Sequence, residues 1–315
     1  MNNYKLISLL VLLFLLCNFA ISAQPKQYTF VTRTLKNSKT LDMANMKISY
    51  SLEFVPDSTE SHKKWKDKKI LLIGETVHHF YSQYSRMQDS VVTNATKAYK
   101  PYSPPAEETA ERYDIYSNFP ENTRTVVENI MTFNMSIYKE ELTDQIWGIT
   151  GEITTILDYL CYKAVCTYRG RIWEAWFTMD IPINAGPWKF RGLPGLIMKV
   201  ADERQHYVFE CTGIEKLKKP EPILMYEAAY PSTVNPDFKY TRDMFLDALR
   251  DFHVNYLNSL LSMGYNVRIV DSSGKVIESI ETPNTTWKDQ NMSYWTTINA
   301  RDRNRKVPYN PIELE

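Results

Sequence analysis

The stretch Gly186-Pro187-Trp188-Lys189-Phe190-Arg191 continues directly into Gly192-Leu193-Pro194-Gly195-Leu196-Ile197. Pro194 and Gly195 fit the two central positions of a type II turn, in which glycine takes a positive φ. Leu193 precedes a proline and so favours extended backbone, and Gly192 allows another backbone segment to approach closely. The stretch should therefore form a rigid buried turn that leads into a strand, or else a backbone platform beside a pocket. The turn residues are Gly186, Pro187, Gly192, Pro194 and Gly195.

The segments on both sides of this stretch alternate apolar and polar residues, which is typical of strands. Upstream, Arg169-Gly170 fits a two-residue turn between antiparallel strands at 160–168 and 171–178. The second of these strands carries a tryptophan on each face, so we expect both faces to be covered. The polar stretch 85–112 is expected to be a long loop. Further strands are expected at 28–34, 47–54, 69–74, 77–84, 123–133, 136–140, 146–150, 153–160, 193–200, 206–214, 265–270 and 275–280.

One long amphipathic helix is expected at residues 241–263. Thr241 is a candidate N-cap, and Gly264 is a candidate residue just beyond the C-terminus. The apolar residues of this segment form one stripe at helical spacing: Phe245, Leu249, Phe252, Tyr256 and Leu260. The predicted fold class is mainly β, of the α+β type. We expect a curved antiparallel sheet or half-barrel with this helix packed on it.

The first 23 residues have the pattern of a signal peptide. Lys5 precedes an apolar run from Leu6 to Leu16, and small residues lead to a cut after Ala23 or one residue earlier. A membrane anchor and a lipoprotein signal at Cys17 are the alternatives, but the run is shorter than the roughly 20 residues of a membrane span. The 315 residues are enough for one large or two small domains. We expect a β domain at 24–217, a proline-rich connector at 218–240, and a helix, hairpin and tail at 241–315, packed on the same domain.

Three cysteines follow the predicted signal peptide: Cys161, Cys166 and Cys211. An exported protein meets an oxidising compartment, which allows one disulfide. Within one strand, Cys161 and Cys166 would lie roughly 16 Å apart at ~3.3 Å per residue. That separation exceeds the ~7 Å Cα limit for a disulfide. A disulfide would therefore join Cys211 to either Cys161 or Cys166.

Composition and motifs exclude several classes of function. The chain has 37 basic and 37 acidic residues, and this balance argues against nucleic acid and anionic membranes as partners. It contains no nucleophile elbow, HExxH, EF-hand loop or dinucleotide fingerprint. His78 and His79 are adjacent and would face opposite sides of a strand, where we expect exposed polar residues and no shared metal ion. We predict no cofactor, no metal site and no catalytic residue.

Aromatic and charged residues next to the turn form the candidate ligand-binding surface. Two large aromatic side chains with interspersed charges can stack on or clamp a ligand. The same residue types also form core clusters around a buried ion pair, and that alternative stays open. The candidate residues are Arg171, Glu174, Trp176, Trp188 and Lys189.

Several stretches together carry a family resemblance. They are Cys161-Tyr162-Lys163-Ala164, Tyr168-Arg169-Gly170-Arg171, Ala175-Trp176-Phe177, Ile181-Pro182, Gly186-Pro187, the hexapeptide from Gly192 to Ile197 and the closing Tyr309-Asn310-Pro311-Ile312-Glu313-Leu314-Glu315. In these stretches the chain resembles the GLPGLI family, a group of secreted proteins of the Bacteroidetes. The resemblance implies export but no particular activity, because the family has no common reaction. The strand pattern is also similar to that of periplasmic carriers of the LolA type, in which an open curved sheet holds an apolar ligand.

These observations favour an exported, non-catalytic protein of the periplasm, the cell surface or the medium. Its expected partner is a small apolar ligand, a peptide, or an outer-membrane or other envelope protein. The alternative is an exported, peptidase-like hydrolase whose active site is not visible as a sequence motif. A third possibility is a purely structural envelope component.

Overall fold

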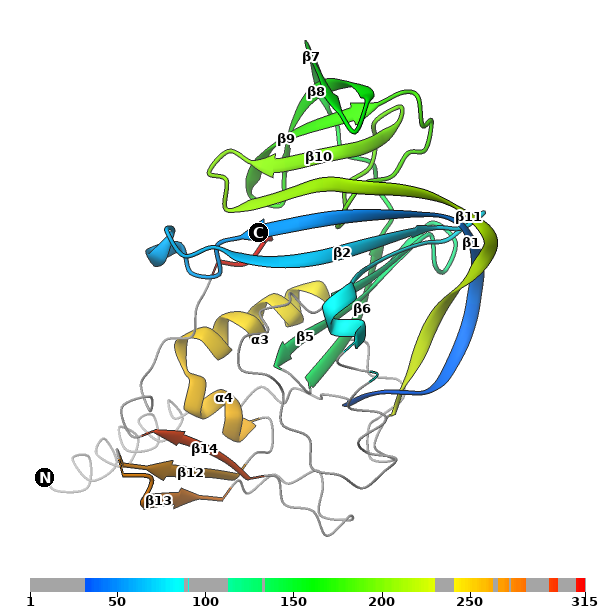
Figure 1. Ribbon diagram of the computed structural model, residues 1–315. Coiled ribbons are helices and arrows are strands. Elements are labelled where there is room, and N and C mark those ends of the chain that lie inside the picture. Colours follow the sequence, from blue (N-terminus) through cyan, green and yellow to red (C-terminus); the bar gives the residue numbers. More distant parts are fainter. Residues whose placement is uncertain are drawn as a thin grey trace, which may run out of the picture. The chain divides into compact units, whose positions relative to one another are not determined.

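The computed structural model describes residues 32–87, 90, 113–131, 134–229, 241–262, 266–271, 273–281, 295–299 and 310–314. The predicted signal peptide, Gly264 and most of the predicted loop at 85–112 lie outside these residues. The described residues fall into two compact units. The larger contains residues 32–257 and 310–314, and the smaller contains residues 258–299 (Figure 1).

The larger unit is built on one antiparallel sheet of eleven strands. The strand order is β6-β5-β4-β3-β2-β1-β11-β10-β9-β8-β7, so β6 and β7 are its edges and the sheet is open. The predicted antiparallel β class is confirmed, but the sheet is large and is not a half-barrel. The strands are β1 (Thr32–Phe54), β2 (Trp65–Ile73), β3 (His78–Ser82), β4 (Tyr113–Ser117), β5 (Thr123–Met131), β6 (Asn134–Glu141), β7 (Gly148–Ile156), β8 (Tyr159–Tyr168), β9 (Arg171–Thr178), β10 (Leu196–Asp202) and β11 (Tyr207–Ala229).

Two strands of 23 residues, β1 and β11, pair from Thr32 with Ala229 at one end to Phe54 with Tyr207 at the other, with irregularities between. The predicted connector is therefore wrong over residues 218–229, which continue β11. Pro220 lies within an irregularity where residues 217–220 have no partner on β1, and such irregular positions tolerate proline. Figure 1 shows both strands bending sharply. The pairing with β1, which is distant in sequence, holds this proline-containing segment in the sheet.

The bent part of β1 and β11 supplies the core on one face of β2–β5, which we call the outer face. There Ala44 and Ile223 pack with side chains of the shorter strands. The inner face carries a second set of buried side chains, because residues alternate between the two faces along each strand. The outer cluster consists of Ala44, Ile70, Leu72, Val77, Tyr116, Val127 and Ile223.

The predicted long helix is two shorter helices. Thr241 is the N-cap of α3 (Arg242–Val254), as predicted, and its side chain accepts a hydrogen bond from the Met244 amide. Asn255, with φ −131° and ψ 62°, interrupts the helix before α4 (Tyr256–Ser262). Only the first part of the predicted stripe lies on α3, where Phe245 packs against Tyr138 of β6 with ring centroids 5.8 Å apart.

The smaller unit contains a three-stranded sheet in the order β13-β12-β14. β12 (Asn266–Val270) and β13 (Val276–Ile280) form the predicted hairpin, whereas β14 (Trp295–Asn299) was not expected. β14 pairs with β12 in parallel, and this pairing joins segments far apart in the chain. Among the described residues, none of the helices combines the length and apolar character needed to cross a membrane.

Candidate functional site

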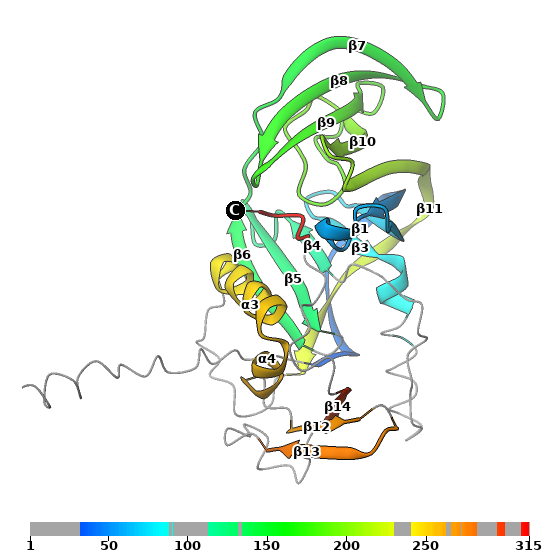
Figure 2. The ribbon, with the colours of Figure 1, turned by 90° about the vertical axis from the view of Figure 1, so that its left-hand side faces the viewer.

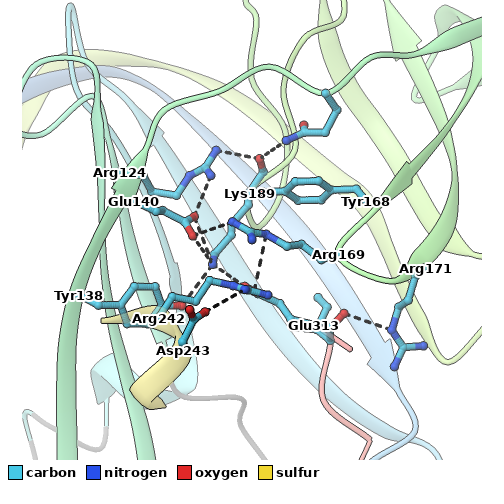
Figure 3. Close-up of polar contacts among 12 residues, drawn as sticks. Arg124, Tyr138, Glu140, Tyr168, Arg169, Arg171, Lys189, Arg242, Asp243 and Glu313 are labelled. Carbon is cyan, nitrogen blue, oxygen red and sulfur yellow. Dashed lines mark hydrogen bonds and ion pairs between the residues drawn. The ribbon is translucent and has the colours of Figure 1, made fainter. Parts of the chain in front are cut away.

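Three segments distant in sequence meet on the inner face of the large sheet. They are the loop after β9 that contains Lys189, the strands β5 and β6, and the segment Asn310–Leu314 (Figure 3). Lys189 is fully buried, and its Nζ donates to Glu313 Oε1. The same Nζ lies 3.2 Å from the hydroxyl of Tyr138 and 3.2 Å from the carboxylate of Glu140. Buried ammonium groups need such partners, because desolvation of an unpaired charge is costly.

The backbone of the loop that contains Lys189 is also held by hydrogen bonds. The Lys189 carbonyl accepts from Arg124 Nη2 at 2.9 Å and from Gln145 Nε2 at 3.4 Å. The Arg191 amide donates to Gln145 Oε1 at 2.8 Å, and the Arg191 carbonyl accepts from Trp147 Nε1 at 2.7 Å. The segment between β6 and β7 therefore fixes the path of the loop.

Three arginines surround the two carboxylates. Arg124 Nη1 lies 2.9 Å from Glu140 Oε1, and Arg169 Nη2 lies 3.0 Å from Glu140 Oε2. Arg242, the first residue of α3, pairs with Glu313. With Lys189 there are four bases for the two carboxylates Glu140 and Glu313. Burial alone would raise the pKa of Glu140, but the charges of Lys189 and Arg124 outweigh it and hold that pKa below its usual value.

Glu128 of β5 is a third buried carboxyl group beside these four bases. It does not balance their excess of positive charge. Burial raises its pKa to about 8, and the negative charges of Glu313 and Glu140 add to this effect against the opposing charge of Lys189. Its Oε1 accepts a hydrogen bond from the Tyr138 hydroxyl at 3.2 Å. At neutral pH this carboxyl group is therefore mostly protonated. We call these seven residues the ionic cluster: Arg124, Glu128, Glu140, Arg169, Lys189, Arg242 and Glu313.

Arg171 forms a second buried contact set, at the first residue of β9. Its Nη1 lies 2.9 Å from Asp202 Oδ2, and its remaining donors reach segment 310–314. Its guanidinium lies over the ring of Tyr207, 5.1 Å from the centroid. All of these partners belong to the protein itself, so Arg171 is engaged in the folded core.

The aromatic residues around the loop pack against one another on the inner face. Trp173 contacts Phe190 with centroids 4.7 Å apart, and Trp188 contacts Phe190 at 5.1 Å. Trp188 has a φ of +52°, which is uncommon for a bulky residue, and it is buried. These aromatic contacts join β9 to the loop between β9 and β10.

The candidate ligand-binding residues do not form one surface. Arg171, Trp188 and Lys189 are buried on the inner face, whereas Glu174 and Trp176 lie on the opposite face of β9. There Lys163 lies 3.3 Å from Glu174 and over the Trp176 ring. The outer face of β9 is only partly covered, which corrects the expectation that both faces are buried. A ligand-binding role for these five residues remains a prediction.

Of the five turn residues, Gly186, Pro187 and Gly195 are buried, Gly192 is partly exposed and Pro194 is exposed, and Gly195 does not have the backbone conformation that was predicted. Its φ is not positive, so the type II turn is wrong there. Instead, a Cβ at Gly195 would meet the backbone carbonyl of Thr178. Gly192 does have a positive φ of +96°, and a Cβ there would meet the Gln145 backbone. Close approach of backbones, more than turn type, explains these glycines. Gly186, Pro187 and Pro194 lie in the same loop.

The three cysteines in the described part of the chain are buried and have raised pKa values. Cys161, Cys166 and Cys211 are buried free thiols, so the predicted disulfide is not formed. Burial raises the pKa of Cys166 to about 12 and that of Cys211 to about 11. Thiols of this kind are poor nucleophiles, because the thiolate is the reactive form.

The two adjacent histidines are not exposed polar residues. His79 is buried, and its Nε2 lies 2.8 Å from Asp114 Oδ1. Its ring stacks on both Tyr81 and Tyr116. Burial, and then the charge of Arg191, lower the pKa of His78 to about 4. Within the described residues, no three His, Cys, Asp or Glu side chains gather as ligands for a metal ion.

The exposed apolar side chains gather at the other end of the sheet. Figure 2 shows β7 at the sheet edge, and every residue of β7 is at least partly exposed. Ile149 is 57% exposed and Ile153 is 63% exposed. Pairing through β8 places these two on the inner face, in line with Ala175 and Phe177 of β9. We call Ile149, Ile153 and Leu160 the edge strip.

Sequence reasoning found Lys189 and Arg171 but missed most of the residues that bind them. Arg124, Glu140 and Arg242 lie on ordinary strand or helix segments, where a charge is usually solvated. For Asn310 and Glu313 the available signal was the resemblance of the closing segment to a family ending. The edge strip was also missed, because single exposed isoleucines have no distinctive pattern.

Comparisons with known proteins find similarity over only part of the chain. A family model described as "Protein of unknown function (Porph_ging)" matches residues 169–199, from the turn before β9 to β10. The resemblance to the GLPGLI family by name remains a prediction. No curated protein matches the chain. The fold and the ionic cluster define the class at the level of an open antiparallel β protein with a charged interior.

Two solved structures with PNGF-II in their titles are similar over part of the chain. One, in the P21 space group, has 15% identity and a TM-score of 0.43, and the other, in the C2 space group, has 16% identity and a TM-score of 0.42. They cover 67% and 66% of this chain, which spans 34% and 33% of theirs, about a third of their length. TM-scores this low do not establish a shared fold.

Proposed function

We propose that this chain is an exported, non-catalytic binding protein whose partner is a polypeptide that adds a strand at the β7 edge. The pattern of the first 23 residues supports export, and the edge strip supports binding. An exposed sheet edge presents unpaired backbone donors and acceptors that another strand can satisfy. The exposed apolar side chains beside it would then select a partner strand with apolar residues at alternate positions.

The composition of β7 is the observation that carries this proposal. Edge strands are usually protected by lysine, proline or inward charges. β7 reads Gly-Ile-Thr-Gly-Glu-Ile-Thr-Thr-Ile over Gly148–Ile156 and contains no lysine or proline. A bulge at residues 150–152 bends it, but Ile153–Ile156 pairs regularly with β8. The opposite edge strand, β6, ends in Lys139-Glu140-Glu141 and packs against α3.

The hydrolase alternative receives no support from the described groups. The buried thiols have raised pKa values, and His79 is enclosed by two tyrosine rings and bonded to Asp114. The charged residues that look most like an active site are paired with one another in the ionic cluster. Non-catalytic binding therefore fits the described residues better than hydrolysis.

Site-specific photo-crosslinking in the native cell tests this proposal. A photoreactive residue at the exposed Thr155 of β7 should yield one discrete crosslinked protein. The same residue at Lys66, which is exposed on the central strand β2, should not. Ile153→Lys should abolish the Thr155 product. A product containing only a second copy of this chain would replace the partner by self-association, and equal products from both positions would refute the edge site.

A further inference from the structure

Segment Asn310–Leu314 lies along the inner face as a short irregular peptide and is bound mainly by side chains of other segments. Arg171 donates from Nε to the Ile312 carbonyl at 3.1 Å and from Nη2 to the Pro311 carbonyl at 2.7 Å. The Leu314 amide donates to the Arg169 carbonyl at 3.1 Å. Contacts to consecutive main-chain groups are how a protein holds an extended peptide ligand.

The first position of the segment is recognised through its side-chain amide. Asn310 Nδ2 donates to the Val55 carbonyl at 2.6 Å, and its Oδ1 accepts from Arg171 Nη2 at 2.9 Å. The Asn310 carbonyl accepts from the Tyr207 hydroxyl. A donor and an acceptor are both used in a buried setting, so the position discriminates against residues that lack either group.

The fourth position is recognised through its charge. Glu313 is buried and pairs with Lys189 and Arg242, and its Oε2 lies 3.7 Å from Arg169 Nε. Without Glu313, Lys189, Arg124 and Arg169 would share Glu140 alone, and Arg242 would keep only the exposed Asp243, 3.5 Å away. The surrounding protein is thus a cationic site with a strong requirement for a carboxylate at this position.

We propose that residues 310–314 occupy a peptide-recognition site that also binds an acidic Asn-Pro-Ile-Glu peptide in trans. The chain's own segment is the resident ligand, and the incoming peptide replaces it contact for contact. The peptide can come from a second copy of this chain or from another protein with the same motif. This site differs from the β7 edge, and its test is independent of the proposed edge partner.

The binding experiment uses the full chain and a fluorescein-labelled Asn-Pro-Ile-Glu-Leu peptide, followed by fluorescence anisotropy. In Asn310→Ala the resident segment loses its amide contacts while Arg171, Val55 and Lys189 stay in place. The peptide should bind this variant at least tenfold more tightly than the wild type, where the resident segment competes at a millimolar effective concentration. A peptide with lysine at the glutamate position should bind at least tenfold more weakly.

The matched control is Leu314→Ala, because the Leu314 side chain is 46% exposed and contributes its contact through the backbone. It should behave like the wild type. An Asn310→Ala chain that melts cooperatively yet binds no peptide would overturn the proposal. Peptide-bound monomer and exchanged dimer, separated by analytical ultracentrifugation, distinguish the two sources of the ligand.

If Asn310→Ala does not fold, a second measurement tests whether the peptide displaces the resident segment. Leu314→Cys in a Cys17→Ser background accepts a thiol-reactive dye at one exposed position, because Cys161, Cys166 and Cys211 are buried. Millimolar peptide should release the labelled segment and lower the dye anisotropy. An anisotropy that is unchanged by the peptide would show that the segment is a fixed part of the core and would overturn the proposal.

Discussion

The two ends of the eleven-stranded sheet differ in which side chains are buried and which are exposed. At the β5–β6 end, the inner face carries charges that are buried and paired, with Lys189 and Glu313 at the centre. At the β7–β8 end, the same face carries isoleucines that are exposed. Charges usually mark a functional surface and apolar residues a core, but here the positions are exchanged. The charges at one end are therefore met by other groups of the chain, whereas the apolar side chains at the other end are open to solvent.

Removing Glu313 should have the largest effect on stability. Glu313→Gln leaves Lys189, Arg124 and Arg169 with Glu140 as their one carboxylate, and loss of one partner from a buried ion pair costs about 3–5 kcal/mol. Urea denaturation followed by tryptophan fluorescence measures the loss. Lys189→Met should cost less, because it leaves three bases for two carboxylates and keeps much of the side-chain volume. If the lysine variant proves the less stable of the two, charge balance is not what holds this end together.

The protonation of Glu128 should make this end sensitive to pH. Its folded pKa of about 8 lies above the ordinary 4.5, so the folded state binds more protons than the unfolded state between these values. The free energy of unfolding therefore falls as pH rises from about 4.5 to 8, by up to about 5 kcal/mol at about 1.4 kcal/mol per pKa unit. Glu128→Gln should flatten this slope in denaturation curves measured across that range. A variant that keeps the wild-type slope would assign it to other groups.

Two glycines differ in what an added Cβ atom would meet. A Cβ at Gly195 would meet the Thr178 carbonyl, so Gly195→Ala should cost roughly 1–3 kcal/mol by overpacking. Gly151, in the β7 bulge, has a φ of +84° and open space around its missing Cβ. Gly151→Ala should therefore cost about 1 kcal/mol, through backbone conformation alone. Thermal melting of both variants tests the order, and equal shifts would mean that the loop relaxes around Gly195.

Local sequence patterns predicted the strands well because alternation is set by each strand's own residues. β8, β9 and the β12–β13 hairpin lie close to where alternation and turn residues put them. The continuation of β11 past Pro220 could not be predicted, because its partner is the distant first half of β1. The break at Asn255 was also missed, since the apolar spacing continues across it. Pairing and packing over long separations decide these features.

The candidate site shows the same limit. Arg171 and Lys189 could be picked out from the sequence because they lie among tryptophans. Their roles could not, because Asp202, Glu140 and Glu313 come from three other segments. A buried base and a ligand-binding base look alike until their partners are known. The sequence alone does not show which carboxylate each of these bases pairs with in the fold.

The smallest effect on stability is expected at the edge strip. Ile153 is 63% exposed, so Ile153→Lys removes little buried area and should change the free energy of unfolding by less than about 0.5 kcal/mol. On the same face but two strands inward, the buried Phe177→Ala should cost about 3–5 kcal/mol, which provides the matched control. Crosslinking from Thr155 should nevertheless disappear in Ile153→Lys, because a lysine on the strip opposes the apolar contact and blocks edge pairing. If Ile153→Lys instead unfolds the protein, the strip is part of the core and the contrast between the two ends of the sheet is wrong.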